Sequence, residues 1–182
     1  FVDMEKMFEL LQQPPDIVDI PDAKALVITE GRIEFAGVYF GYSKAGLVLR
    51  GLSVDVPPRH TVAFVGATGA GKSTIGRLLF RLYDLDRGTG GAIRIDGTDI
   101  RDVKQASLRS AIGVVPQDTV LFNDTIKYNL LYGRPDATDQ EVEAAARAAA
   151  IHDAIMAFPE QYRTRVGERG LRLSGGEKQR VA

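Results

Sequence analysis

The chain has 182 residues, with 23 Lys and Arg against 24 Asp and Glu, a net charge of −1, and 45% hydrophobic residues. This apolar fraction excludes a disordered chain, and the length allows one domain with a core, with or without an additional arm. The balanced charge excludes a nucleic-acid binder held by a basic surface, so we expect no nucleic-acid partner. The absence of cysteine excludes disulfides, thiolate metal sites and a cysteine nucleophile.

The first expected element is a helix over residues 1–12. Its apolar side chains recur at three- and four-residue steps and so share one face: Phe1, Met4, Phe8 and Leu11. This helix either packs on its own domain or forms the end of a longer helix from an upstream domain. Pro14 and Pro15 stop it, so residues 13–31 are expected to form a linker.

The body of the chain begins at Arg32 and reads as α/β. Apolar and β-branched content predicts strands over residues 32–40, 47–56, 61–65, 92–96 and 112–115. A helix is expected over 72–83, where apolar residues recur on one face. Further along, Thr138 and Glu141 form a capping-box pattern that starts an alanine-rich helix reaching about residue 150. Another helix is expected over 152–158, so residues 124–182 are predicted to be mainly helical.

The strongest chemical signal is a phosphate-binding loop between the strand 61–65 and the helix that follows. It fits the pattern G-x-x-x-x-G-K-[ST], and with the next residue it comprises Gly66, Ala67, Thr68, Gly69, Ala70, Gly71, Lys72, Ser73 and Thr74. Glycines allow backbone amides to turn toward phosphates, and the helix presents its positive end to them. Lys72 supplies a cation near the β- and γ-phosphates, and the Ser73 hydroxyl is a candidate ligand of Mg²⁺. The alternative is a glycine-rich turn without a ligand.

A second motif, Leu173-Ser-Gly-Gly-Glu-Lys-Gln-Arg180, is more specific than the loop. Ser174 and Glu177 have the spacing of a capping box, so the motif could simply begin a helix. Two glycines in a first turn, however, each cost about 1 kcal/mol of helix propensity. Their presence is explained if bare amides must approach an anion closely.

Together these motifs resemble the ATP-binding cassette (ABC) proteins, and the resemblance covers residues 32–182. It implies a P-loop NTPase core of the ABC type with an antiparallel β-subdomain and an incomplete helical subdomain. It also implies that two cassettes bind head to tail, with each ATP between the phosphate loop of one and the signature of the other. The signature residues Ser174, Gly175 and Gly176 would contact the γ-phosphate held by the partner. Glu177 is expected to turn back toward the Ser174 amide, because its carboxylate would repel ATP.

Three lesser positions fit the same family. Tyr42 resembles the aromatic residue that stacks on adenine, although an aromatic residue near a strand end is often simply core. Gln117 resembles the glutamine whose amide touches Mg²⁺ and the attacking water; taken alone, it is a polar strand end. Glu168 and Arg169 lie in a segment similar to the x-loop of exporter-type cassettes. The alternative is that they are simply a solvent-exposed pair of charged residues.

The family's Mg²⁺-holding Asp and catalytic Glu follow an apolar strand shortly after the signature, and this sequence contains no such segment. We therefore expect a cassette truncated before that strand (Walker B). Residues 1–31 would be the linker from a missing transmembrane domain, and residues 32–182 the cassette, with 124–182 its helical part. The whole protein would hydrolyse ATP with Mg²⁺ to drive export, with Lys72 and Gln117 as catalytic residues.

Residues 107–126 and 166–180 look like the mitochondrial iron–sulfur-linked and heavy-metal-tolerance half-transporters and their bacterial relatives, which act as homodimers. That resemblance implies thiol-peptide conjugates, metal–thiol complexes or porphyrins as cargo. It implies a mitochondrial, vacuolar or bacterial inner membrane, with the cassette on the cytoplasmic or matrix side. The alternatives are an importer ATPase subunit, a soluble ABC-type ATPase of DNA repair or translation, and a binding module that does not hydrolyse ATP.

Overall fold

The computed structural model describes residues 4, 6–8, 11, 13–43, 46–167 and 173–182. The chain divides into two compact units, the first over Phe1–Gly113 and the second over Val114–Ala182. Residues 4, 6–8 and 11 are helical, as predicted for the start of the chain. Their apolar side chains are exposed, with Met7 at 65% and Leu11 at 77%, so they do not pack on a core of the first unit.

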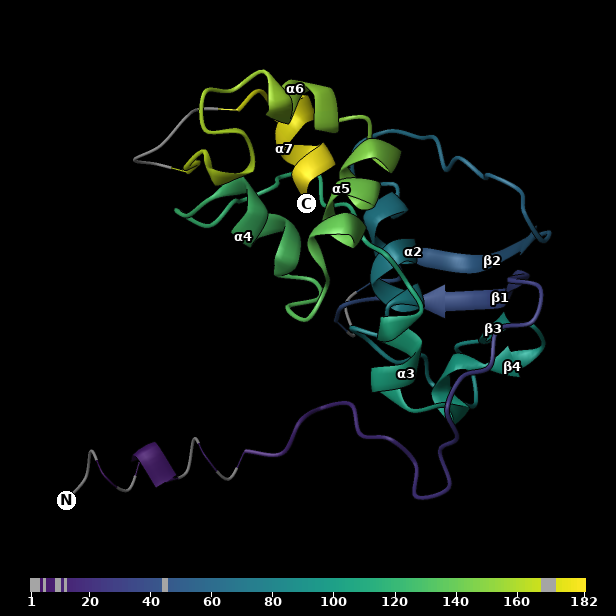
Figure 1. The fold of residues 1–182 in the computed structure, drawn as a ribbon. Helices are drawn as coiled ribbons and strands as arrows, with labels where there is room; N and C mark the ends of the chain where they lie inside the picture. Colours follow the sequence, from purple (N-terminus) through teal and green to yellow (C-terminus); the bar gives the residue numbers. More distant parts are fainter. Residues whose placement is uncertain (1–3, 5, 9–10, 12, 44–45, 168–172) are drawn as a thin grey trace. The chain divides into compact units, whose positions relative to one another are not determined.

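The first unit is organised around a four-stranded antiparallel sheet in the order β2-β1-β3-β4 (Figure 1). The strands are β1 Ile33–Phe40, β2 Leu49–Val56, β3 Ala92–Ile95 and β4 Thr98–Asp99. β1 pairs with both β2 and β3, with irregular register against β2 between Phe35 and Tyr39. These strands confirm the predicted antiparallel β-subdomain.

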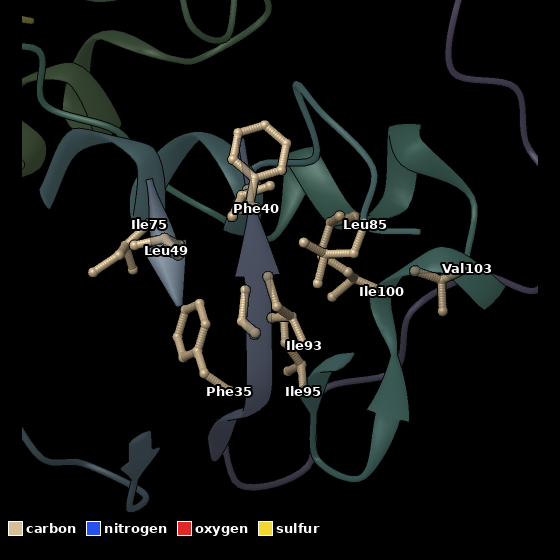
Figure 2. Packing of buried hydrophobic residues seen from close by; sticks show 12 residues of the cluster. Phe35, Phe40, Leu49, Ile75, Leu85, Ile93, Ile95, Ile100 and Val103 are labelled. Carbon is tan, nitrogen blue, oxygen red and sulfur yellow. The ribbon is translucent and has the colours of Figure 1, made fainter. Parts of the chain in front are cut away.

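Helix α2 (Lys72–Leu79) shares one buried hydrophobic core with the sheet. Its inward face carries Ile75 and Leu78, which are 8% and 0% exposed. Figure 2 shows Ile75 beside Leu49 of β2, with Phe35, Phe40 and Ile93 nearby. The buried cluster comprises Phe35, Val38, Phe40, Leu49, Ile75, Leu78, Leu85, Ile93, Ile95, Ile100, Val103 and Leu108. The core therefore fixes the helix whose first residue is the lysine of the phosphate loop.

Three predicted elements differ from the structure. Residues 61–65 and 112–115 are not strands, and Val65 and Val115 are 90% and 68% exposed. An apolar segment becomes a strand only where a neighbour satisfies its backbone groups, and none of the described segments pairs with these two. Helix α2 ends at Leu79 rather than at residue 83, because Arg81 adopts a left-handed conformation with φ 52°. The 3₁₀ helix η1 (Ile100–Asp102) and helix α3 (Gln105–Ser110) complete the first unit.

The carboxylates of two aspartates connect the predicted linker, residues 13–31, to the rest of the first unit by hydrogen bonds. The Asp19 carboxylate accepts hydrogen bonds from the Arg81 guanidinium at 3.2 Å and from the Gln105 backbone amide at 3.1 Å. The Asp96 carboxylate accepts bonds from the four consecutive backbone amides of residues 29–32 at 2.8–3.1 Å. These amides, Gly31 and Thr29 foremost, hold the pKa of Asp96 far below its usual range.

The second unit is helical, as predicted for residues 124–182. Its helices are α4 Ile126–Leu131, α5 Asp139–Ala148, α6 His152–Met156 and α7 Gly175–Val181, with the 3₁₀ helix η2 at Gln161–Arg163. The predicted capping box is present, because the Thr138 hydroxyl accepts from the Glu141 amide while the Glu141 carboxylate accepts from Thr138. A separate core contains Ile126, Ala146, Ile151, Ile155, Val166, Leu173 and Val181.

Candidate functional site

The phosphate loop has the backbone conformation that its glycines make accessible. Gly69 and Gly71 have φ values of 83° and 90°, in the left-handed region that side-chain-bearing residues resist. Residues 66–70 are exposed, whereas Gly71 is buried against β2. A Cβ at Gly71 would lie 2.9 Å from the Leu49 Cδ2 atom and 3.1 Å from the Val48 Cγ1 atom. Glycine at 71 is therefore needed for both conformation and space.

Helix α2 begins directly from this loop without a side-chain cap. Its N-cap is Gly71, and no side chain accepts a hydrogen bond from the amides of the first turn. The first turn also contains no acidic residue. The positive end of the helix dipole and its free amides are thus available to an anion.

Lys72 lies across the loop that precedes it. Its ammonium group donates hydrogen bonds to the carbonyl oxygens of Gly66 and Ala67 at 2.7 and 2.8 Å. Because an ammonium group has three donor hydrogens, one remains for a phosphate oxygen beside the loop. The structure therefore places the predicted cation against the predicted phosphate cradle.

Ser73 and Thr74, the next two residues, differ in whether their hydroxyl groups are free to bind a ligand. Ser73 is exposed, and its hydroxyl has no hydrogen-bond partner in the described part of the chain. Thr74 is only 4% exposed, and its amide donates to the Gly71 carbonyl at 3.0 Å. The Thr74 hydroxyl bonds with the Tyr42 hydroxyl at 3.0 Å. Ser73 is thus free to meet a ligand, whereas Thr74 would have to exchange an existing bond.

Tyr42 lies beside α2 and is 44% exposed, so it is not a core residue. Its hydroxyl accepts a hydrogen bond from the Arg77 guanidinium at 3.0 Å, and that guanidinium also lies over the Tyr42 ring, 5.8 Å from its centroid. Desolvation, the largest influence, raises the pKa of Tyr42. The hydrogen bonds with Thr74 and Arg77 and the Arg77 charge lower it, and the net pKa is below the usual value.

The second unit carries the other predicted site residues, and these are connected with one another. Gln117 is exposed in a loop, and its backbone carbonyl accepts a hydrogen bond from the Gln179 side chain at 3.3 Å. Gln179 belongs to α7, the helix that the signature opens. Glu168 and Arg169 lie outside the described residues.

The signature opens α7 with the capping box that its spacing predicts. The Ser174 hydroxyl accepts from the Glu177 amide at 3.3 Å, and the Glu177 carboxylate accepts from the Ser174 amide at 2.7 Å. The Ser174 hydroxyl also donates to the Glu177 carboxylate at 2.7 Å, and this bond, together with that from the Ser174 amide, lowers the pKa of Glu177. The prediction that Glu177 turns back toward Ser174 is confirmed. A Cβ at Gly175 would meet nothing within 4 Å, so packing within the described residues does not require glycine there.

Sequence reasoning missed two contacts of the site. Arg77 belongs to no motif, although it stands three residues after Thr74 and hence on the same helix face. The bond between Gln179 and Gln117 joins residues that are 62 positions apart, for which the sequence carries no local signal.

Acidic side chains in the described part of the chain do not form a metal centre of their own. Among the described residues, no group of three or more His, Cys, Asp or Glu side chains could hold a metal ion. No helix in the described segments is long and apolar enough to cross a bilayer. The exposed, unpartnered Ser73 hydroxyl beside the loop fits a single ligand position on Mg²⁺, with phosphate oxygens supplying others.

Comparisons with known proteins agree on one family. The family model described as "ABC transporter" matches residues 49–182. "ATP-binding cassette sub-family B member 6" of Homo sapiens is 63% identical over 182 residues, which are 100% of this chain and 21% of that protein. The "ATM1-type heavy metal exporter" of Novosphingobium aromaticivorans is 55% identical over 181 residues, covering 100% of this chain and 29% of that protein.

A solved structure has the same fold. It is described as "Structure of a bacterial Atm1-family ABC exporter with ATP bound", and it superposes with a TM-score of 0.90 at 54% sequence identity. The match covers 99% of this chain and 31% of that one. The chain thus spans less than a third of the length of these relatives.

Proposed function

This chain belongs to the ABC transporter family, and on that premise we propose that it is the ATP-binding cassette of a half-transporter that exports a substrate across a membrane. The observation that carries the proposal is the phosphate loop. Two glycines in left-handed conformations lead into a helix without a side-chain cap, and the Lys72 ammonium lies against the loop carbonyls. This combination suits the triphosphate of ATP better than any uncharged ligand.

The proposed contacts with the triphosphate of ATP centre on the phosphate loop and the first turn of α2. The amides of residues 66–73 and the Lys72 ammonium hold the phosphates, and the exposed Tyr42 ring stacks on adenine. Ser73 and Gln117 are the proposed ligands of Mg²⁺. When bound, Mg²⁺ would offset negative charge on the β- and γ-phosphates. Lys72 would stabilise the charge that develops as water attacks the γ-phosphate, and Gln117 would orient that water.

The signature is proposed to act on a second copy of the cassette. Ser174, Gly175 and Gly176 would contact the γ-phosphate held by the partner in a head-to-tail homodimer. The open space around Gly175 supports this assignment, because neither a left-handed conformation nor internal crowding explains the glycine. A bare amide that must approach a phosphate closely does explain it.

We extend the proposal to the protein of which this chain would be a part. Residues 1–31 would lead from an upstream transmembrane domain, and an Asp–Glu pair that completes hydrolysis would follow the signature. The cassette would lie on the cytoplasmic or matrix side of a mitochondrial, vacuolar or bacterial inner membrane. The likeness to a heavy metal exporter favours an exporter over an importer subunit or a soluble ATPase. It also favours metal–thiol or related conjugates as the cargo.

The test compares two glycines that stand in open space within the second unit. Gly175→Asp places a carboxylate where the partner's γ-phosphate is proposed to bind, whereas Gly133→Asp makes the same charge change elsewhere; neither position has an atom within 4 Å of an added Cβ. In the full-length protein, Gly175→Asp should retain its fold and bind Mg-ATP while losing most of its phosphate release. Gly133→Asp should behave as wild type. Equal hydrolysis by wild type and Gly175→Asp would contradict the proposed role of the signature.

A further inference from the structure

The hydroxyl of Tyr42 is held by two residues of the helix that begins at the phosphate loop. Arg77 donates to it at 3.0 Å, and the Thr74 hydroxyl bonds with it at 3.0 Å. Thr74 and Arg77 stand three residues apart on α2, so both point from one face of this helix toward Tyr42. Tyr42 itself lies 32 positions before Thr74 and 35 before Arg77 in the sequence.

The Tyr42 ring is also held at its sides. Its centroid lies 5.1 Å from that of Phe40 and 5.0 Å from that of Tyr83, with both pairs edge to face. The Arg77 guanidinium lies over the ring, 5.8 Å from the centroid. Side-chain rotation of Tyr42 therefore requires breaking two hydrogen bonds and these ring contacts together.

From this geometry we propose that Arg77 and Thr74 are positioning residues that fix the Tyr42 ring for the adenine of ATP. The inference rests on the proposed function, and it deepens it by naming the residues that orient the base-stacking side chain. It also means that one helix holds both ends of the nucleotide, the triphosphate at its first turn and the adenine through Tyr42. Thr74 then serves Tyr42 rather than a phosphate.

The physical reason is pre-organisation. A stacking side chain that is free to rotate must lose that freedom when the base binds, and the loss weakens affinity. Guanidinium nitrogens can only donate hydrogen bonds, so the Arg77 bond defines the Tyr42 oxygen as its acceptor and fixes the direction of the ring. Lysine would not reproduce this, because it lacks a planar group that both donates and stacks.

The experiment uses two probes that separate the base from the phosphates. Affinities for Mg-ATP and for inorganic tripolyphosphate with Mg²⁺ are measured by isothermal titration on the full-length protein. The variants are Tyr42→Phe, Arg77→Gln and Thr74→Val, with Thr74→Ser as the conservative rescue. Arg87→Gln is the matched control, because Arg87 is an exposed arginine of the first unit that pairs with Asp102 at 2.9 Å.

Each of the first three variants should weaken ATP by about three- to tenfold, the effect of one hydrogen bond, and leave tripolyphosphate affinity unchanged. Thr74→Ser and Arg87→Gln should bind both ligands as wild type does. In the Tyr42→Phe background, Arg77→Gln should have little further effect, because the acceptor of its hydrogen bond is already gone.

Two results would overturn the inference while leaving the ATP site intact. Unchanged ATP affinity in Arg77→Gln would show that Arg77 does not orient the ring. An equal loss of ATP and tripolyphosphate affinity in Thr74→Val would assign Thr74 to the phosphates instead. By contrast, a wild-type protein that binds neither ligand would refute the proposed function itself, and the inference with it.

Discussion

Replacing Gly71 with alanine tests how the sequence shapes the phosphate loop. Gly71 has φ 90°, and alanine in the left-handed region costs about 1–2 kcal/mol. The new Cβ would also lie 2.9 Å from the Leu49 Cδ2 atom and 3.1 Å from the Val48 Cγ1 atom. Such overpacking costs about 1–3 kcal/mol more, so Gly71→Ala should destabilise the protein by about 2–5 kcal/mol.

Gly69→Ala is the matched control in the same loop. Gly69 has a similar φ of 83°, but a Cβ there would meet nothing within 4 Å. Only the conformational cost of about 1–2 kcal/mol should therefore apply. Urea unfolding measures the free energy of unfolding of the two variants. Gly71→Ala should be less stable than Gly69→Ala by about 1–3 kcal/mol, and this difference is the cost of crowding against β2. Equal destabilisation by the two substitutions would refute the reasoning, because it would leave no role for crowding at Gly71.

Three further predictions concern adenine, acid and a buried charge. Tyr42→Ala should weaken ATP binding by about 1–3 kcal/mol in isothermal titration while Tyr42→Trp largely preserves it; an Ala variant with normal affinity would exclude stacking. Because backbone amides lower the pKa of Asp96 in the folded state, its stabilising contribution is present above about pH 4 and is lost as the pH falls through the folded-state value. In Asp96→Asn, the free energy of unfolding measured in urea should therefore fall less steeply as the pH is lowered. An unchanged dependence on pH would contradict this. Arg81 is 1% exposed and pairs with Asp84 and Asp19, so Arg81→Ala should cost about 3 kcal/mol, and a change below 1 kcal/mol would argue against its structural role.

The parts of the fold that the sequence predicts well are those controlled by neighbouring residues. Thr138 and Ser174 each precede a glutamate by three positions, and both form the capping boxes that this spacing favours. The strand that becomes β1 and the helix that starts at Lys72 are likewise defined by local patterns. The glycine spacing of the phosphate loop predicts the left-handed conformations at Gly69 and Gly71, because few other residues adopt them.

The features that sequence reasoning missed depend on residues far apart in the chain. Residues 61–65 have the composition of a buried strand, yet strand formation requires a pairing neighbour that composition does not supply. The end of α2 depends on Arg81, whose left-handed backbone accompanies a buried guanidinium bound to Asp19 in the linker. Arg77 has no motif of its own, and its relation to Tyr42 is visible only once α2 and the loop that follows β1 are placed together.

The most direct test of the central claim is a titration of Mg-ATP into the full-length protein and its Lys72→Ala variant. Alanine is compatible with the helix start, so the fold should remain while the one side-chain cation at the loop is removed. Lys104→Ala, which removes an exposed lysine elsewhere in the first unit, is the control. We expect tight binding by wild type and Lys104→Ala, and none by Lys72→Ala. Unchanged affinity in Lys72→Ala would contradict the assignment of residues 66–73 as the ATP phosphate site.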